Sequence, residues 1–289
     1  MTETHEQWDI VSGVGLTALA VASARAIATG RPDGLVEDPF AAAFVRAANP
    51  PKPMPTGPEG AGGDEVWTAM ATYMDLRSRF FDDLLAGSAA PQVVILAAGL
   101  DARAYRLDLT GRDVYEVDQP RVLAFKQDVL DGLGARPRCH RHPVATDLRE
   151  DWPAALAEAG FDRSRPTVWL VEGLLPYLPP DAEEQLFEIV HARSAPGSRI
   201  GIEQILDGGA EELAQVMRQM KAADLVGIDL DGLLDTAPRR DPATWLRGQG
   251  WTVHSMSVDE AAAGHGRTLP AGLGHIIPRP GLTTADLPR

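Results

Sequence analysis

Two residues stand where a nucleoside-binding sheet places its ligand contacts. Gly99 closes the apolar run 93–98, and Asp118 closes a second short run, 114–117, nineteen residues after Gly99. A continuous apolar run of this kind is typical of a strand buried on both faces. Gly99 allows a ligand to approach the backbone closely, and a carboxylate at the end of the following strand can bind the hydroxyl pair of a ribose. The spacing therefore predicts half of a nucleoside-binding site.

The loop after the first strand departs from the dinucleotide fingerprint Gly-x-Gly-x-x-Gly. That pattern would need glycines where the chain has Leu100, Asp101 and Ala104. Glycines at these positions would make room for a pyrophosphate at the start of a helix, and this chain lacks them. The loop therefore favours a ligand with a ribose but no phosphate, such as S-adenosylmethionine. It argues against a nicotinamide-dependent oxidoreductase on the same kind of sheet.

Polar residues also follow the ends of later strands. Asp147 follows the third expected strand, where its carboxylate could accept from an adenine amine while Leu148 packs on the ring; alternatively, Asp147 caps the next helix. Glu172 ends the fourth expected strand, at the crevice where open α/β sheets bind ligands. Its alternative is a structural salt bridge.

Two arginines could bind a carboxylate of the ligand. Arg77 lies four residues after Tyr73 in an expected helix, so the two side chains share a face. A guanidinium binds a carboxylate through a bidentate fork. Arg103 has a similar position near Gly99. For both arginines the alternative is a solvated surface side chain.

Composition limits the classes of partner. The 289 residues include 27 basic and 41 acidic ones, a net charge of −14, which opposes binding to nucleic acid or anionic membranes. Cys139 is the single cysteine, so neither an internal disulfide nor a Cys-rich metal site is expected. His140 and His142 face one side of an expected strand without a third ligand, and no metal site is predicted. No apolar run reaches membrane-spanning length and the N-terminus lacks a positive leader, so a cytoplasmic protein is expected.

Expected strands and helices alternate along most of the chain, which predicts an α/β fold. We expect one domain over residues 1–289: a helical cap (1–90), a cofactor-binding core (91–206), and a substrate-side insertion with the last two strands (207–289). The cap comprises helices 13–30 and 64–85 around a Pro/Gly-rich loop, 49–63. The expected strands are 92–98, 113–117, 138–145, 166–172, 197–204, 251–258 and 273–278, and the later helices are 120–133, 151–160, 181–194, 207–224 and 241–249.

Several of these stretches together resemble one family, the leucine carboxyl methyltransferase-like, S-adenosylmethionine-dependent methyltransferases. The similarity is greatest to the bacterial branch common in actinomycetes, which includes polyketide O-methyltransferases. The resemblance implies a Rossmann-like, seven-stranded methyltransferase sheet with helices on both faces and an N-terminal helical cap. The matching stretches are 15–20 (Gly-Leu-Thr-Ala-Leu-Ala), 38–40 (Asp-Pro-Phe), 77–83, 98–103 (Ala-Gly-Leu-Asp-Ala-Arg), 116–120 (Glu-Val-Asp-Gln-Pro), 147–152 (Asp-Leu-Arg-Glu-Asp-Trp), 172–178 (Glu-Gly-Leu-Leu-Pro-Tyr-Leu) and 195–198 (Ala-Pro-Gly-Ser).

The resemblance also implies a role for each matching residue. The family usually has glycine where this chain has Ala97, and threonine where it has Ala102. Cofactor-binding roles fall on Arg77 for the methionine carboxylate, Gly99 beneath the methionine portion, Asp118 for the ribose, Asp147 and Leu148 for the adenine, and Glu172 beside the sulfonium.

The primary hypothesis is a methyltransferase that acts on an oxygen of a small molecule, such as a polyketide-like metabolite. A carboxylate acceptor needs no general base, whereas a hydroxyl acceptor needs one. Glu172 and Tyr177 are the catalytic candidates by their position alone. The alternatives are a non-catalytic S-adenosylmethionine-binding protein and, with less support, a nicotinamide-dependent oxidoreductase.

Overall fold

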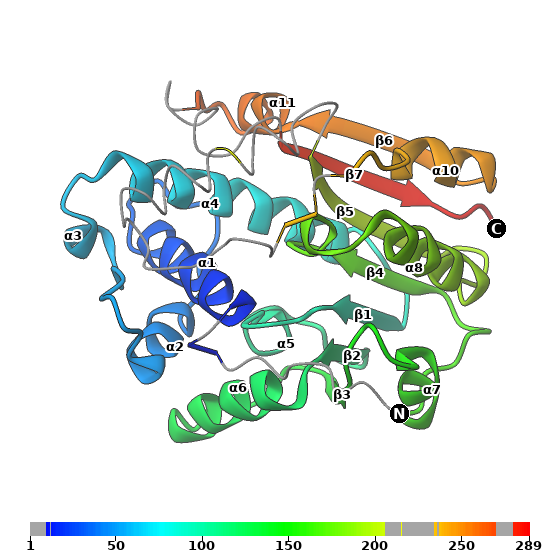
Figure 1. Ribbon diagram of the computed structural model, residues 1–289, viewed down its shortest axis with the longest axis horizontal. Helices are drawn as coiled ribbons and strands as arrows, with labels where there is room; N and C mark the ends of the chain where they lie inside the picture. Colours follow the sequence, from blue (N-terminus) through cyan, green and yellow to red (C-terminus); the bar gives the residue numbers. More distant parts are fainter. Residues whose placement is uncertain (1–9, 12, 206–214, 216–233, 236, 270–279) are drawn as a thin grey trace.

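A single sheet organises the computed structural model, which describes residues 10, 11, 13–205, 215, 234, 235, 237–269 and 280–289. In these residues seven strands lie in the order β3-β2-β1-β4-β5-β7-β6 (Figure 1), with β1 to β5 parallel and β7 antiparallel between β5 and β6. The predicted α/β fold class is confirmed. The strands are β1 (Gln92–Leu96), β2 (Asp113–Asp118), β3 (His140–Ala145), β4 (Thr167–Val171), β5 (Arg199–Ile205), β6 (Thr252–Ser257) and β7 (Pro280–Asp286).

The last strand differs from its prediction. The expected strand 273–278 and, apart from residue 215, the expected helix 207–224 lie outside the described residues. The strand that pairs with both β5 and β6 is β7, whose register places Gly201 opposite Thr284 and Leu282 opposite Met256. The sequence analysis missed it because Pro280 and Gly281 are turn-forming residues. Tertiary pairing on both sides overrides that local preference.

Helices cover both faces of the sheet. One face is packed by α4 (Glu65–Ala86), α6 (Pro120–Gly132) and α11 (Val258–Gly264). The other is packed by α7 (Trp152–Glu158), α8 (Pro180–Ala192) and α10 (Pro242–Gly248), as Figure 1 shows. Along β1, Val93 and Ile95 point to the first layer, while Val94 and Leu96 point to the second. This burial on both faces explains why the strand is apolar at every position.

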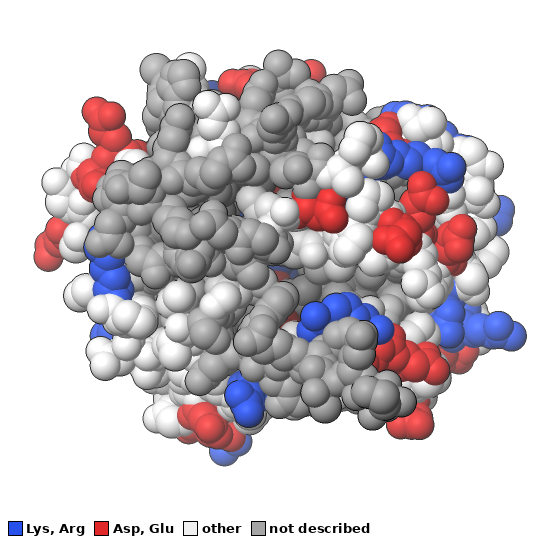
Figure 2. Space-filling view, in the orientation of Figure 1, with Lys and Arg blue, Asp and Glu red and all other residues white. Residues whose placement is uncertain are grey.

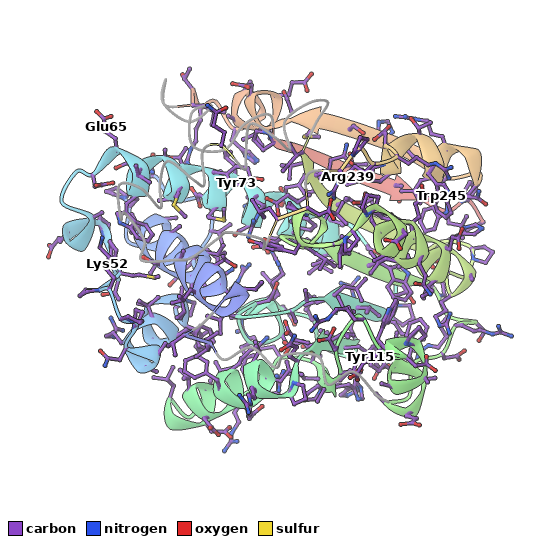
Figure 3. All side chains as sticks on the ribbon, viewed as in Figure 1. Lys52, Glu65, Tyr73, Tyr115, Arg239 and Trp245 are labelled. Carbon is purple, nitrogen blue, oxygen red and sulfur yellow. The ribbon has the colours of Figure 1, made fainter. Side chains whose placement is uncertain are left out.

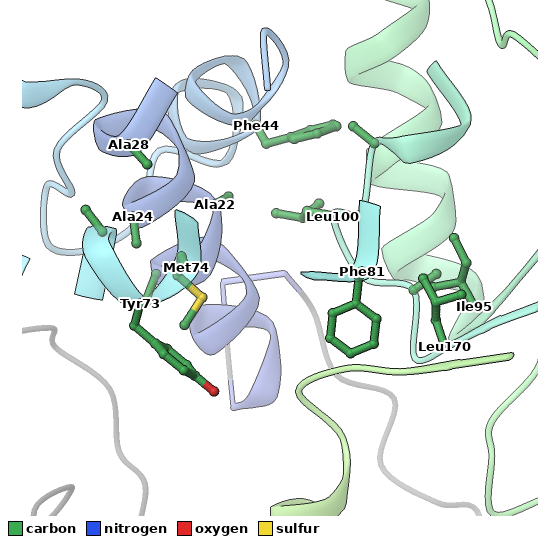
Figure 4. Close-up of a cluster of buried hydrophobic side chains, with 14 of the residues drawn as sticks. Ala22, Ala24, Ala28, Phe44, Tyr73, Met74, Phe81, Ile95, Leu100 and Leu170 are labelled. Atoms are coloured by element: carbon green, nitrogen blue, oxygen red, sulfur yellow. The ribbon is translucent and has the colours of Figure 1, made fainter. Parts of the chain in front are cut away.

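The N-terminal helices are α1 (Val14–Thr29), α2 (Ala41–Ala48), α3 (Pro58–Ala61) and α4 (Glu65–Ala86). The last of these also covers the sheet: a Cβ on Gly201 of β5 would lie 2.5 Å from Leu84 and 2.9 Å from Phe81, so only glycine admits the helix at this point. Helix α1 packs against both α2 and α4, and its buried alanines, among them Ala22 and Ala24 on different sides of the helix in Figure 4, allow close approach. The N-terminal segment is therefore both scaffold for the sheet and a cover over its edge.

Side chains of both charges are visible on the described part of the surface. On the face drawn in Figure 2, the described Lys and Arg side chains are interspersed with Asp and Glu. In the part of the chain that the structure describes, no helix has the length and apolar character needed to cross a membrane.

Candidate functional site

A cavity of about 360 Å³ opens at the carboxyl ends of the parallel strands. Five strands end at this edge, where open α/β sheets bind their ligands. The helices α1 and α4 complete the walls, with side chains such as Val21, Met70 and Met74 that make the cavity largely apolar. From the strand ends, the lining includes residues 97–101, 118–119, 146–149, 172–174, 176–178 and 203–205.

Gly99 and Asp118 meet at the centre of this edge. Gly99 has a φ of 46°, in the left-handed region that favours glycine. Its N–H donates to Asp118 Oδ2 at 2.6 Å, and the Gln119 N–H donates to Oδ1 at 2.6 Å. Burial raises the pKa of Asp118, although these two backbone donors oppose the shift. The carboxylate is thus held by the loop after β1, at the position predicted to bind a ribose.

The loop before Gly99 contains a residue in an uncommon conformation. Ala97 has a φ of 52°, which a non-glycine residue rarely adopts. The left-handed conformation costs an L-residue about 1–2 kcal/mol. The predicted departure from the family pattern, alanine in place of glycine, therefore falls on a backbone geometry that suits glycine better. The geometry is kept because β1 and Gly99 hold the loop on either side.

Arg77 lies buried beside the cavity, with its guanidinium between two carboxylates. Its Nε is 2.8 Å from Glu172 Oε1, and its Nη1 is 3.0 and 2.9 Å from the two carboxylate oxygens of Glu203. Tyr73, on the same helix face as the spacing predicts, donates its hydroxyl to Glu203 (Tyr73 is labelled in Figure 3). Burial and the Glu203 charge raise the pKa of Tyr73 well above its ordinary value, so the phenol keeps its proton.

Glu203 is the site residue that sequence reasoning missed. It lines the cavity at the carboxyl end of β5, where the Gly173 N–H donates to its Oε2 at 2.6 Å. A carboxylate within the apolar strand Arg199–Ile205 was the available signal, because Glu172 was selected for the same kind of position one strand earlier.

Arg103 is not among the described residues that line the cavity. Its side chain is 3% exposed and lies behind the wall, where it binds Asp82 at 2.7 Å, Glu172 at 2.7 Å and Asp101. The guanidinium therefore holds Glu172 and Asp101 in place. Its predicted direct contact with a ligand carboxylate does not fit this position.

Glu172 and Tyr177 both line the cavity, but neither is suited to accept a proton. Burial would raise the pKa of Glu172, yet the guanidiniums of Arg103 and Arg77 hold it below the ordinary value, and each carboxylate oxygen is in an ion pair. Burial raises the pKa of Tyr177, while a hydrogen bond with Thr17 acts in the other direction. A carboxylate stabilised in its charged form is a weak base, and a phenol with a raised pKa stays neutral.

Asp147 and Leu148 line the cavity at the end of β3. The Asp147 carboxylate accepts from the Arg149 backbone N–H at 2.9 Å and from Gln119 Nε2 at 3.0 Å. The alternative interpretation of Asp147 as a helix cap is wrong, because Asp151 caps α7 through the Ala154 N–H at 3.1 Å. Both predicted adenine contacts thus lie on the cavity wall.

Among the described residues, one network of buried charges beside the cavity contains unequal numbers of the two signs. Arg103 and Arg106 both bind Asp82, Arg103 also binds Asp101, and the network continues through Glu172 to Arg77 and Glu203. Three guanidiniums thus face four carboxylates. One additional negative charge in a buried setting complements a ligand with a net positive charge.

The histidine pair has a structural partner. His140 Nδ1 and His142 Nε2 lie 3.5 and 3.2 Å from one oxygen of Asp113, and the His142 ring stacks on Tyr115. Among the described residues, no group of three or more His, Cys, Asp or Glu side chains is arranged to hold a metal ion.

Solved structures with this arrangement are methyltransferase-like folds. A methyltransferase structure from Thermobifida fusca covers 94% of each chain with a TM-score of 0.53 at 17% identity. A DUF574 family protein from Streptomyces avermitilis covers 85% of this chain and 96% of its own, with a TM-score of 0.52 at 16% identity. At these identities the likeness shows the fold alone, an α/β methyltransferase-like fold.

Relatives by sequence define the family. Residues 18–191 match the leucine carboxyl methyltransferase family, and the chain belongs to it. A Saccharopolyspora erythraea protein assigned as an S-adenosyl-L-methionine-dependent methyltransferase is 50% identical over 277 residues, 92% of each chain. A Rhodococcus jostii protein with the same assignment is 46% identical over 279 residues, 93% of each chain. The protein is an S-adenosylmethionine-dependent methyltransferase.

Replacing Ala97 by glycine should stabilise the protein. We expect the free energy of unfolding to rise by about 0.5–1 kcal/mol, because the left-handed strain is relieved while glycine's freedom in the unfolded chain removes part of the gain. Urea unfolding measures the change. Ala98→Gly is the matched control: Ala98 is buried with a φ outside the left-handed region, so glycine should destabilise there. Equal effects at both positions would show that Ala97 is unstrained.

Proposed function

We propose that the protein transfers the methyl group to an oxygen of a small molecule, and that one cavity holds cofactor and acceptor side by side. The supporting observation is the continuity of the cavity, which runs from Asp118 and Leu148 to Tyr177 and Met70. The first pair lies at the ends of β2 and β3, and the second pair lies on the turn after β4 and on α4.

The residues present fit the cofactor. In the proposed arrangement Asp118 accepts from the ribose hydroxyls, and Asp147 and Leu148 contact the adenine. Arg77 binds the methionine carboxylate through Nη2, since Nε and Nη1 face Glu172 and Glu203. The excess buried carboxylate matches the net positive charge of the cofactor. S-adenosyl-L-methionine, when bound, supplies a methyl group activated by a sulfonium.

The chain's own contribution to the reaction is orientation and exclusion of water. The apolar side chains of Val21, Met74 and Leu174 surround the space beside Glu172, so an acceptor there is desolvated. Tyr177 of the turn Leu175–Tyr177 and Thr17 of α1 both line the cavity, so the turn and α1 form part of its wall together. Holding the acceptor oxygen in line can supply much of the rate enhancement.

The acceptor that this site suits is one that needs no strong base. Because Glu172 is paired on both oxygens and Tyr177 keeps its proton, neither takes a proton readily. A carboxylate is already charged at neutral pH, and an acidic phenol or enol ionises without much help. We therefore propose a carboxylate or an acidic hydroxyl as the acceptor group.

A transfer screen tests the proposed chemistry. Purified protein and S-adenosylmethionine are incubated with matched sets of aromatic carboxylic acids, phenols, aliphatic alcohols and amines, and products are identified by mass spectrometry. We expect methyl esters or methyl ethers from the first two sets, formed in step with S-adenosylhomocysteine. Transfer confined to nitrogen would contradict the proposal, and tight cofactor binding without any transfer would favour the non-catalytic alternative. Binding of NAD in a calorimetric control would favour the oxidoreductase.

Asp118→Asn should weaken S-adenosylhomocysteine binding by about 1.5–3 kcal/mol, the value of a hydrogen bond to a charged group. In the wild type, protonation of the Asp118 carboxylate removes the same charged hydrogen-bond acceptor. Because burial raises the pKa of Asp118, binding should weaken as pH falls, beginning above the ordinary aspartate range of about 4. Isothermal titration across pH measures both effects, and the pH dependence should be absent in the variant. Unchanged affinity in a folded variant would disprove the assignment.

Arg77→Lys should selectively reduce affinity for ligands that carry the methionine carboxylate. Lysine keeps the positive charge between Glu172 and Glu203, but its single nitrogen cannot contact both carboxylates and the ligand as the three guanidinium nitrogens can. We expect at least a tenfold loss for S-adenosylhomocysteine and little change for methylthioadenosine, which lacks that carboxylate. Arg79→Lys is the control, since Arg79 is exposed and paired with Asp83. Equal losses for both ligands would make Arg77 a structural residue.

A further inference from the structure

The acceptor side of the cavity is built on a short turn whose carbonyls are held from outside. The 3₁₀ turn Leu175–Tyr177 follows β4, and its neighbours Leu174 and Leu178 also line the cavity. Within the turn, only the Leu174 and Leu175 carbonyls accept from its own N–H groups, so the carbonyls that follow need partners from elsewhere. Asp235 and Arg239, in the segment 234–239, supply such partners.

Arg239 binds both ends of this turn. Its Nη1 donates to the Leu175 carbonyl at 2.7 Å, and its Nη2 approaches the Leu178 carbonyl at 3.5 Å. The same Nη1 donates to Glu183 Oε2 on α8 at 2.7 Å, and Nη2 donates to the Asp235 carbonyl at 2.6 Å. One guanidinium therefore joins the turn, α8 and the returning segment; Figure 3 shows Arg239 close to α8.

A backbone hydrogen bond from the same segment also holds the turn. The Asp235 N–H donates to the Pro176 carbonyl at 2.9 Å, so the segment holds the middle of the turn as well as its ends. Leu234, the preceding residue, lines the cavity. Glu183 is 2% exposed, and breaking its pair with Arg239 would leave a buried group without its counter-ion. These contacts fix the backbone of the turn at the carbonyls of Leu175, Pro176 and Leu178.

The side chain that this turn presents is Tyr177. Tyr177 lines the cavity together with Thr17 of α1, so the turn also affects where α1 meets the cavity wall. Any shift of the Leu175 or Leu178 carbonyl would rotate the turn and move the phenol. The position of Tyr177 thus depends on Arg239 through the backbone of the turn, which Arg239 binds at Leu175 and Leu178.

We propose that Arg239 is a positioning residue: by holding the turn Leu175–Tyr177, it fixes the wall of the cavity that carries Tyr177. The proposal rests on the proposed function only in that it takes this wall to be the side that binds the acceptor. The planar guanidinium reaches three backbone carbonyls and a carboxylate at once. A lysine at this position would keep the charge opposite Glu183 but offer a single nitrogen. Fork geometry, rather than charge alone, is what the turn requires.

Fluorine NMR on the full chain tests this role. The four tyrosines are labelled as 3-fluorotyrosine, and the Tyr177 resonance is assigned by its loss in Tyr177→Phe. With S-adenosylhomocysteine bound, we expect one Tyr177 resonance in the wild type, and a shifted or split resonance in both Arg239→Met and Arg239→Lys. The Tyr73 resonance should keep its wild-type chemical shift, and the Kd for S-adenosylhomocysteine should stay within twofold of the wild type. Both are expected because the cofactor side of the cavity is built from other contacts.

Arg240→Met is the matched control, since the adjacent Arg240 is 54% exposed and lies 3.7 Å from Glu184; its Tyr177 resonance should equal that of the wild type. A Tyr177 resonance unchanged in Arg239→Lys would overturn the proposal, even if the melting temperature falls, because that result describes a purely structural residue. If Arg239→Met does not fold, the lysine variant alone decides. The readout requires no acceptor and no methyl transfer, so its failure is distinguishable from failure of the proposed O-methylation.

Discussion

Buried ion pairs between α4 and the ends of the central strands are the interaction on which the site depends. Arg77 of α4 binds Glu172 after β4 and Glu203 on β5. Arg103, after β1, joins Glu172 to Asp82 of the same helix. Removing one partner from such a pair leaves an uncompensated buried charge, which typically costs about 3–5 kcal/mol. Helix α4 and the sheet are thereby held in one arrangement, and the cavity forms between them.

The same network explains why the site is suited to binding and orientation more than to proton transfer. Two guanidiniums keep Glu172 ionised and occupied, so it adds negative charge to the cavity without acting as a base. Charges fixed in an apolar setting interact strongly with a cationic ligand, since little water screens them. An enzyme that moves an already activated methyl group needs this kind of fixed environment.

Close approach of the backbone is the second constraint. Gly201 lets α4 lie directly on β5, and the alanines of α1 let that helix lie on α4 and over the cavity. Gly99 turns the loop after β1 so that its N–H reaches Asp118. Ala97 also has a left-handed backbone conformation in that loop, although glycine would suit this conformation better. The loop is therefore maintained by its surroundings.

The sequence by itself determined the parallel sheet and the strand ends that form the cavity. Apolar runs closed by Gly99, Asp118 and Glu172 could be recognised because burial on both faces of a strand and the ligand-binding edge leave a local signature. Asp147 and Leu148 were selected in the same way, and both line the cavity. A strand such as β7, stabilised by pairing with β5 and β6 in spite of its Pro-Gly start, left no such signature.

Only the tertiary structure decided which charged groups meet. Arg77 and Glu203 are 126 residues apart, and Arg103 and Glu172 are 69 apart, so no local pattern could reveal either pair. The sequence suggested that Arg103 contacts the ligand and that Glu172 might be a base, but the ion pairs they form with each other exclude the first from the cavity wall and weaken the second as a base. Residue type and strand position are local properties, whereas the pairing and protonation of a side chain depend on neighbours that folding alone brings together.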